Sequence, residues 1–265
     1  MMLLINLRRS IGVMKKNDVI TVLRVFAGVV AWFIVSKGLG NYVDSIVGGT
    51  WGMILKSMVI PYTLGLLAFF LPCIGMPAKK VETGSYIAPT AGLLLKAFVV
   101  QTGLSFPLVF IINIITHLTG HELSGISSED LFGNMWFYLV LLLVFNPVLE
   151  EVLFRKLVLE RLAPIGFKGA VIVSAVLFAL PHLYSQGIAQ VPYTFAIGLV
   201  LAWLTVKTGK LWPAIVLHAL SNVYGAYIPM GLGLIHPACS VLFVLFTMGV
   251  IVPLTVVILT HKKQQ

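Results

Sequence analysis

The chain has 265 residues, of which 59% are hydrophobic and only 10% are charged, and its mean hydropathy is +1.02. Because a soluble domain carries about 25% charged residues, this composition excludes an ordinary globular protein and indicates a polytopic membrane protein. The net charge of +9 does not indicate nucleic-acid binding, since the basic residues lie in short loops and near the termini, as membrane topology requires. The two cysteines form neither a disulfide framework nor a metal-binding spacing.

The chain contains eight apolar stretches, each close to the length of about 20 residues that crosses a hydrocarbon core. We therefore predict an all-α polytopic membrane bundle of about eight transmembrane helices. The sixth stretch begins so soon after the fifth that the two are expected to form a tight antiparallel pair. In chain order the stretches are 19–36, 51–71, 91–116, 134–162, 169–184, 188–206, 211–226 and 234–260.

The basic residues follow the alternation that this count requires. One side holds Lys37 and otherwise mostly acidic or neutral residues. By the positive-inside rule, the opposite side is cytoplasmic and contains both termini, and the protein is a multi-pass protein of the cell membrane. The loops and ends predicted on the cytoplasmic side hold Arg8, Arg9, Lys15, Lys16, Lys79, Lys80, Lys156, Arg161, Lys168, Lys207, Lys210, Lys262 and Lys263.

The fourth stretch contains two adjacent carboxylates and a guanidinium, Glu150, Glu151 and Arg155. Charged groups at a helix centre cost roughly 2.5–3.5 kcal/mol each on insertion scales, so they mark candidate functional sites. Glu151 and Arg155 are four residues apart and can form an ion pair on one helix face. Glu150 is turned away from Glu151 by about 100°. A purely structural ion cluster is the alternative, but one Glu–Arg pair would suffice for it and leave the second acid unexplained.

Two later stretches also carry polar side chains at intramembrane depth. Phe178 and His182 share a face of the fifth stretch, and His218 and Asn222 share a face of the seventh. Taken singly, His182 can be a core histidine that donates to a backbone carbonyl, and His218 and Asn222 can join two helices by hydrogen bonds. Taken together with Glu150, they predict one buried site formed by three helices.

Such a set of groups is suited to the hydrolysis of a carbonyl compound, most naturally a peptide bond. A carboxylate and a histidine that face one water can act as general bases. A second histidine and an asparagine amide can stabilise an oxyanion. Alternatively, one Glu and two His can hold zinc, although no H-E-x-x-H pair is present.

The fourth, fifth and seventh stretches carry three motifs, which in chain order are Glu150-Glu151-x-x-x-Arg155, Phe178-x-x-x-His182 and His218-x-x-x-Asn222. These motifs resemble those of the CPBP family. This family contains CAAX prenyl proteases (endopeptidases) and bacteriocin-processing or immunity proteins, also called Abi. The resemblance covers roughly residues 136–227 and implies an intramembrane glutamate-type endopeptidase with an eight-helix core. It further implies that Glu150 and His182 activate the water, that His218 and Asn222 form the oxyanion site, and that Glu151, Arg155 and Phe178 support them.

With this resemblance we expect helices without a motif over 1–130, catalytic helices over 131–230, and a final transmembrane helix with a basic tail over 231–265. We expect no cofactor; if zinc is used, its ligands are Glu150, His182 and His218. The expected partners are the lipid bilayer and a membrane-associated peptide or lipidated protein substrate, without nucleic acid. Alternatives to the peptidase are a non-enzymatic immunity or regulatory membrane protein and a transporter or proton-coupled channel.

Overall fold

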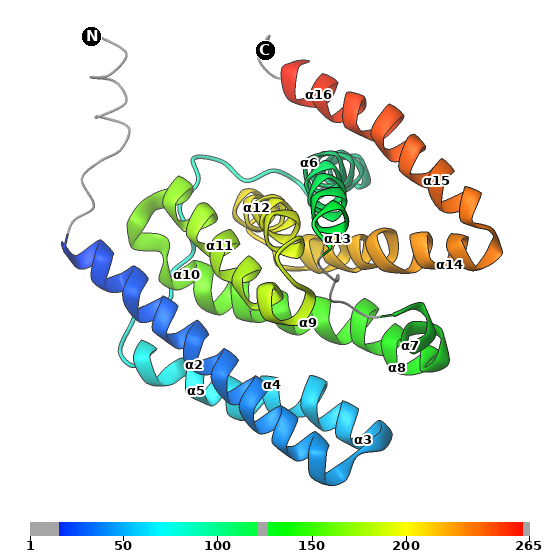
Figure 1. Cartoon of the computed structure of the whole chain (residues 1–265). Helices are drawn as coiled ribbons and strands as arrows, with labels where there is room; N and C mark the ends of the chain where they lie inside the picture. The colour runs from blue at the N-terminus through cyan, green and yellow to red at the C-terminus, as the bar shows by residue number, and fades with distance from the viewer. Residues whose placement is uncertain (1–15, 121–126, 262–265) are drawn as a thin grey trace.

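The computed structural model describes residues 16–120 and 127–261 of the chain. Over these residues all regular structure is helical, and eight helices are long and apolar enough to cross a membrane (Figure 1). The predicted all-α bundle of eight spans is therefore confirmed. Arg8, Arg9, Lys15, Lys262 and Lys263 lie outside the described residues. The spans are Lys16–Val47, Gly49–Cys73, Ala91–Leu118, Met135–Arg161, Ala163–Gln186, Gln190–Thr208, Trp212–Ile235 and Pro237–His261.

Most spans consist of several consecutive helical segments. Segments labelled α are α-helical, and those labelled η are π-helical, except that η4 is a 3₁₀ turn. In the N-terminal half they are α2 (Lys16–Val47), α3 (Gly49–Ile54), η1 (Leu55–Val59), α4 (Ile60–Tyr62), α5 (Leu64–Cys73) and α6 (Ala91–Leu118). Next come α7 (Ser128–Gly133), α8 (Met135–Val140), η2 (Leu141–Phe145), α9 (Asn146–Glu151), η3 (Val152–Val158), α10 (Leu159–Arg161) and η4 (Ala163–Ile165). The remainder are α11 (Gly166–Gln186), α12 (Gln190–Thr208), α13 (Trp212–Asn222), η5 (Val223–Tyr227), α14 (Ile228–Ile235), α15 (Pro237–Phe246), η6 (Thr247–Ile251) and α16 (Val252–His261).

Prolines explain most of the π-helical segments. The segments η1, η2, η5 and η6 each end two residues before a proline, namely Pro61, Pro147, Pro229 and Pro253. A proline has no N–H to donate, so the regular ladder of backbone hydrogen bonds cannot continue at that turn and shifts locally. Each shift leaves a carbonyl that a neighbouring helix can satisfy. The segment η3, which contains Arg155, has no such proline.

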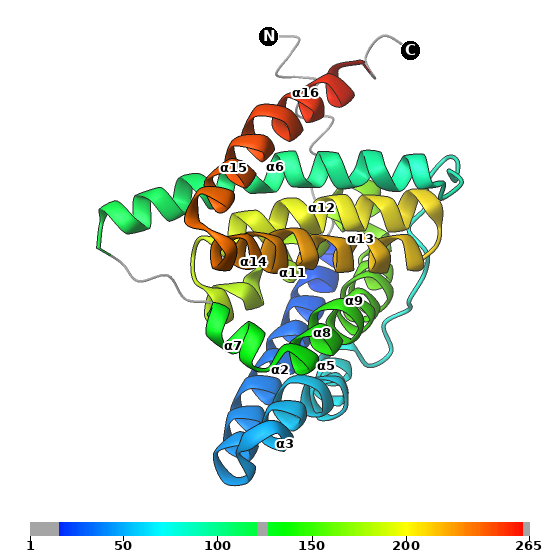
Figure 2. The same ribbon diagram turned by 90° about the vertical axis from the view of Figure 1, so that its right-hand side faces the viewer.

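The core of the bundle is formed by α11 and α12, which pack against each other as predicted, with α6 and α13 against α12. Figure 2 shows α6, α12 and α13 running side by side while α2 crosses them steeply. On one flank, α2 pairs with the span from α3 to α5, and on the other, the last span contacts α6. A cluster of buried apolar side chains joins α2, α5, η3, α11 and α12 and holds the charged fourth span in place.

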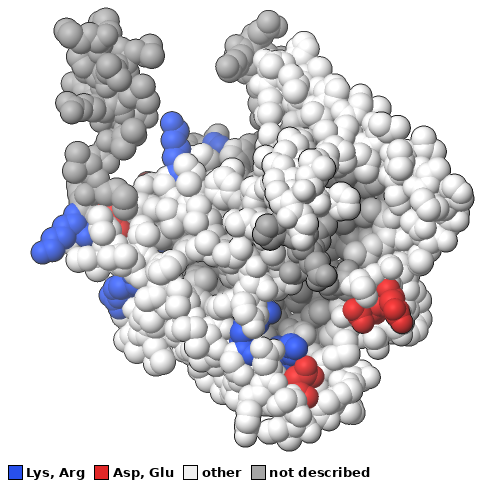
Figure 3. Space-filling view, viewed as in Figure 1, with Lys and Arg blue, Asp and Glu red and all other residues white. Residues whose placement is uncertain are grey.

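The outer surface of the bundle is apolar, as expected for a protein surrounded by lipid. The face shown in Figure 3 carries no Lys, Arg, Asp or Glu over most of its area. Because hydrocarbon solvates such side chains well, their exposure carries no penalty in a membrane. Large exposed apolar side chains occur on many spans, among them Leu23, Ile34, Leu67, Leu95, Leu242 and Val256.

Two boundaries differ from those expected. The first span was expected to end at Ser36, but α2 continues to Val47 and its 32 residues extend roughly 48 Å. The continuation is polar, and it is stabilised by the ion pair of Asp44 with Lys56 of η1, whose atoms are 3.1 Å apart. The seventh stretch was expected to end at residue 226, but its span continues through α14 to Ile235.

Gly28 permits the close approach of α2 to α5, and its replacement tests this contact. A Cβ at Gly28 would lie 2.9 Å from the Phe69 carbonyl oxygen and 3.0 Å from Cys73 Sγ. Since a backbone oxygen cannot move aside, we expect Gly28→Leu to lower the free energy of unfolding by about 1–3 kcal/mol. Thermal unfolding of the purified variant in detergent measures this loss of stability. Gly38→Leu on the same helix, where a Cβ would meet nothing within 4 Å, is the matched control and should unfold like the unaltered protein.

Candidate active site

Arg155 is held by a buried network in which Glu151 is its ionic partner. Arg155 Nε lies 3.0 Å from Glu151 Oε2, and both side chains are 0% exposed. Arg155 Nη1 donates to Ser174 Oγ at 3.2 Å, and Ser174 Oγ donates to the Phe154 carbonyl at 3.0 Å. The guanidinium also lies 4.7 Å from the centre of the Phe178 ring. The predicted ion pair is therefore present, and it fixes the position of the Glu151 carboxylate.

The same carboxylate also binds His218 of α13. His218 Nδ1 lies 3.0 Å from Glu151 Oε1. A carboxylate paired with Arg155 is an acceptor only, so Nδ1 carries the proton and donates it. This bond fixes the plane of the imidazole and directs Nε2 toward Glu150 Oε2, 3.9 Å away. Glu151 therefore connects Arg155 to His218, in addition to the pairing with Arg155 that the sequence predicted.

Glu150 faces the same imidazole as Glu151, but it lies 3.9 Å from Nε2 rather than near Nδ1. Its side chain is 16% exposed, in contrast to the fully enclosed Glu151. Besides His218, it interacts electrostatically with Lys37 of α2 and with Tyr62 of α4. Glu150 is thus the more accessible carboxylate of the pair and the one that a water molecule can reach.

His182 lies beside this group, on the far side of an aromatic ring. Its Nδ1 lies 3.0 Å from the Phe178 carbonyl oxygen one turn earlier in α11, and this bond leaves Nε2 as an acceptor. The centre of the Phe178 ring is 5.2 Å from that of His182 and 5.7 Å from that of His218. The backbone hydrogen bond of an ordinary core histidine is therefore present, yet the ring also contacts Phe178 and interacts electrostatically with His218.

Asn222 is anchored to the helix that carries Glu150. Its Nδ2 donates to the Leu142 carbonyl at 2.7 Å. In a π-helical register this carbonyl would accept from residue 147, which is a proline and has no N–H. One N–H of the amide therefore satisfies a carbonyl that Pro147 leaves open, and the other N–H remains available as a donor.

The structure thus brings the three predicted motifs together, although the separations between their side chains differ. Glu150, Glu151 and His218 are in direct contact, His182 is adjacent across Phe178, and Asn222 is held against η2. Two carboxylates of unequal burial beside two imidazoles are suited to the abstraction and return of a proton.

A comparison with known families matches the segment that carries these residues. Residues 132–224 match the model of the type II CAAX prenyl endopeptidase Rce1-like family. This segment is similar to that family, and we refer to it as the Rce1-like domain. The resemblance to the CPBP and CAAX protease family is therefore confirmed at the level of the family. No curated protein and no solved structure matches the chain significantly.

The Rce1-like domain contains all three motifs, from the acidic pair to Asn222. It extends from the end of α7 to the start of η5 and includes the packed helices α11 and α12. The first three spans and the last span lie outside the match. The chain is consequently a multi-pass membrane protein whose second half contains a segment similar to type II CAAX prenyl endopeptidases.

The donor set for zinc is not assembled in the Rce1-like domain. Among the residues that the structure describes, no three His, Cys, Asp or Glu side chains form a group able to hold a metal ion. Glu151 and Nδ1 of His218 are engaged with each other, which leaves no third ligand beside Glu150 and His218. The alternative ligand set of Glu150, His182 and His218 is therefore not gathered around one point in this conformation.

Sequence reasoning missed two residues of the site. Ser174, which bonds Arg155, precedes Phe178 and His182 by four and eight residues, so the spacing of a single helix face contained the signal. Lys37 was assigned to a loop, yet it lies within α2 and interacts electrostatically with both Glu150 and His182. Only the continuation of α2 beyond Ser36 brings that ammonium group to the acidic pair.

Proposed function

We propose that the protein is an intramembrane endopeptidase that hydrolyses peptide bonds of membrane-associated peptides or lipidated proteins. The observation that carries this proposal is the contact between Glu150 and His218 beside the buried Glu151–Arg155 pair, with His182 adjacent. The match to the Rce1-like family supplies the reaction class. Neither a structural ion pair nor a helix–helix hydrogen bond requires a second carboxylate at that place.

In the proposed reaction, Glu150 and His182 activate one water molecule. Glu150 accepts a proton from the water, whose oxygen forms a bond with the carbonyl carbon of the peptide. The carbonyl oxygen becomes an oxyanion and accepts hydrogen bonds from the Asn222 amide and from Nε2–H of His218, whose imidazole carries a proton on both nitrogens in this step. When the C–N bond breaks, the proton held by Glu150 passes to the departing nitrogen. Water is consumed, and an acid and an amine are formed.

The remaining residues position these groups. Glu151 orients His218 through Nδ1, and Arg155 holds Glu151 in turn. Phe178 packs against the guanidinium and both imidazoles and keeps the three groups at fixed separations. Rigid support of this kind lowers the cost of reaching the reactive geometry.

We further propose that the basic end of the bundle, defined by Lys79, Lys80, Lys156, Lys207 and Lys210, faces the cytoplasm. This proposal follows from the positive-inside rule and places both termini on that side of the cell membrane, by default a bacterial inner membrane. The substrate class that fits an apolar setting is a lipid-anchored or membrane-inserted peptide. A prenylated C-terminus, a bacteriocin leader and a signalling peptide share that chemistry.

Comparative peptidomics tests the proposed function. Membranes from cells that carry the active protein should contain cleavage products that are absent with Glu150→Ala or His182→Ala. For the purified protein, loss of the His182 base should reduce the cleavage rate roughly 10²–10⁴-fold. Normal insertion of both variants into the membrane is the control. Identical peptide profiles, with a protective or regulatory effect that survives both substitutions, would instead establish the non-enzymatic alternative.

A further inference from the structure

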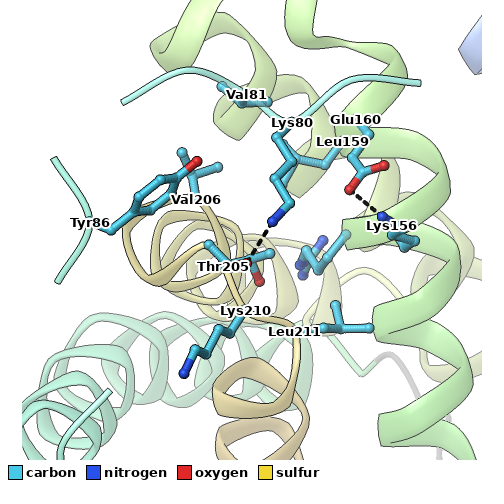
Figure 4. Close-up of a pocket in the computed structure, with 12 residues that line it drawn as sticks. Lys80, Val81, Tyr86, Lys156, Leu159, Glu160, Thr205, Val206, Lys210 and Leu211 are labelled. Atoms are coloured by element: carbon cyan, nitrogen blue, oxygen red, sulfur yellow. Dashed lines mark hydrogen bonds and ion pairs between the residues drawn. The ribbon is translucent and has the colours of Figure 1, made fainter. Parts of the chain in front are cut away.

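A cavity of about 360 Å³ opens at the basic end of the bundle, and Glu150 is not among the residues that line it. Its walls come from the linker between α5 and α6, from η3 with α10, and from the end of α12 (Figure 4). The basic side chains that line it are Lys80, Arg155, Lys156 and Lys210. The proposed peptidase reaction uses none of the three lysines.

The linker is fixed over this cavity by hydrogen bonds. The Ile87 N–H donates to the Lys207 carbonyl at 2.8 Å, and Lys207 Nζ donates to Thr83 Oγ1 at 2.8 Å. The turn at Gly209 has a φ of +65°, and a Cβ there would lie 2.7 Å from the Tyr86 ring. Glycine is therefore required at this turn, and the cavity is a built feature of the fold.

The charges in the cavity are unbalanced. Glu160 is the one carboxylate that lines it among the described residues, and Lys156 neutralises it at 2.7 Å. Lys80 Nζ lies 3.3 Å from the Gly209 carbonyl, as Figure 4 shows, which leaves its positive charge uncompensated. Lys210 adds a further positive charge to the rim. The cavity therefore has a surplus of positive charge that favours an anion.

Arg155 supplies the second observation that points to an anion. Its side chain is 0% exposed, yet Nη2 has no hydrogen-bond partner among the described residues. Buried donors are normally satisfied, and a guanidinium next to an open cavity is matched by the oxygens of a phosphate. Arg155 thus lines the cavity and carries one guanidinium nitrogen that lacks an acceptor among the described residues.

We propose that this cavity binds a phosphate group carried by the headgroup of an anionic membrane lipid. Val81, Leu159 and Leu211 give it an apolar wall suited to the lipid glycerol and the first acyl carbons. The half-exposed Trp212 follows at the start of α13, as is common where helices meet headgroups. Basic pockets at the ends of transmembrane helices bind such headgroups.

The bound phosphate would complete the coordination of Arg155 and so stabilise the Glu151–His218 pairing on the other side of the helix. This consequence rests on the proposed peptidase function, whereas lipid binding does not. Binding is therefore measured with the inactive Glu150→Gln protein, so that failure of one proposal is distinguishable from failure of the other.

The test titrates purified Glu150→Gln protein in detergent with dihexanoyl phosphatidylglycerol, with dihexanoyl phosphatidylcholine and with inorganic phosphate, and follows the thermal midpoint. Phosphatidylglycerol alone should raise the midpoint saturably. Adding Lys80→Gln and Lys210→Gln should weaken this binding roughly 10- to 30-fold, because each surface lysine contributes about fivefold or slightly less. Lys168→Gln, an exposed lysine that does not line the cavity, is the matched control and should bind normally.

Three results would overturn the proposal. Equal stabilisation by the two lipids would show that the headgroup charge does not matter. Undiminished phosphatidylglycerol binding without Lys80 and Lys210 would place the lipid elsewhere. Saturable binding of inorganic phosphate without binding of phosphatidylglycerol would retain the anion site but exclude a lipid as its occupant.

Discussion

A Glu150→Gln variant is expected to cleave substrate roughly 10²–10⁴-fold more slowly than the unaltered protein, because an amide cannot accept the proton of the water. The substitution keeps the size of the side chain and removes a charge that lies near a second carboxylate. The variant should therefore fold and unfold normally, with a free energy of unfolding within about 0.5 kcal/mol of the original or slightly higher. Cleavage rates with a membrane peptide in proteoliposomes check the loss of activity, and thermal unfolding checks the unchanged stability.

Glu129→Gln is the control for this experiment. Glu129 is an exposed carboxylate in the short helix α7, distant from the buried ion pair in sequence and environment. Its replacement should change neither rate nor stability. Retained cleavage in Glu150→Gln would refute the assignment of Glu150 as the base. Exhaustive chelation of the unaltered protein should leave its rate unchanged, and restoration by added zinc after a loss would instead indicate a metal mechanism.

The number and order of the spans could be predicted from the sequence because the membrane imposes a simple rule. A stretch of about 20 apolar residues has few alternatives to a spanning helix. The rule fails where a polar side chain is neutralised by a partner on another helix. The apolar stretch was expected to end at Ser36, with Lys37 outside it, yet Asp44 pairs with Lys56 and the helix continues to Val47.

The candidate site could be predicted only as far as helix periodicity allows. Spacings of four placed Glu151 with Arg155 and His218 with Asn222 on common faces, and both faces meet in the structure. Periodicity cannot reveal which atom contacts which across two helices. The bond from His218 to Glu151 and the bond from Asn222 to the Leu142 carbonyl therefore required coordinates. The second bond also depends on the missing N–H of Pro147.

The Arg155→Met substitution is expected to cause the largest loss of stability, about 3–5 kcal/mol, because it leaves the fully buried Glu151 carboxylate without its cation. The double variant Arg155→Met with Glu151→Gln removes both charges and should recover a substantial part of this loss, since a neutral pair is far less costly to bury. The unfolding free energies of the two single variants and the double variant, measured by denaturant titration in detergent, form a double-mutant cycle that isolates the interaction.

Arg161→Met is the matched control for this cycle. Arg161 is also buried, belongs to the same span and donates to the Leu157 carbonyl, but no carboxylate lies within ion-pair distance of it among the described residues. Its loss should therefore cost less than that of Arg155, about 1–2 kcal/mol. Equal losses at Arg155 and Arg161, with no recovery in the double variant, would mean that the Glu151–Arg155 pair contributes only packing. The role of Arg155 in positioning Glu151 and His218 would then be refuted.

If Arg155 does position Glu151 and His218, a further result is expected for the double variant. Gln at position 151 can still accept a hydrogen bond from His218 Nδ1, so the double variant should also recover cleavage relative to Arg155→Met.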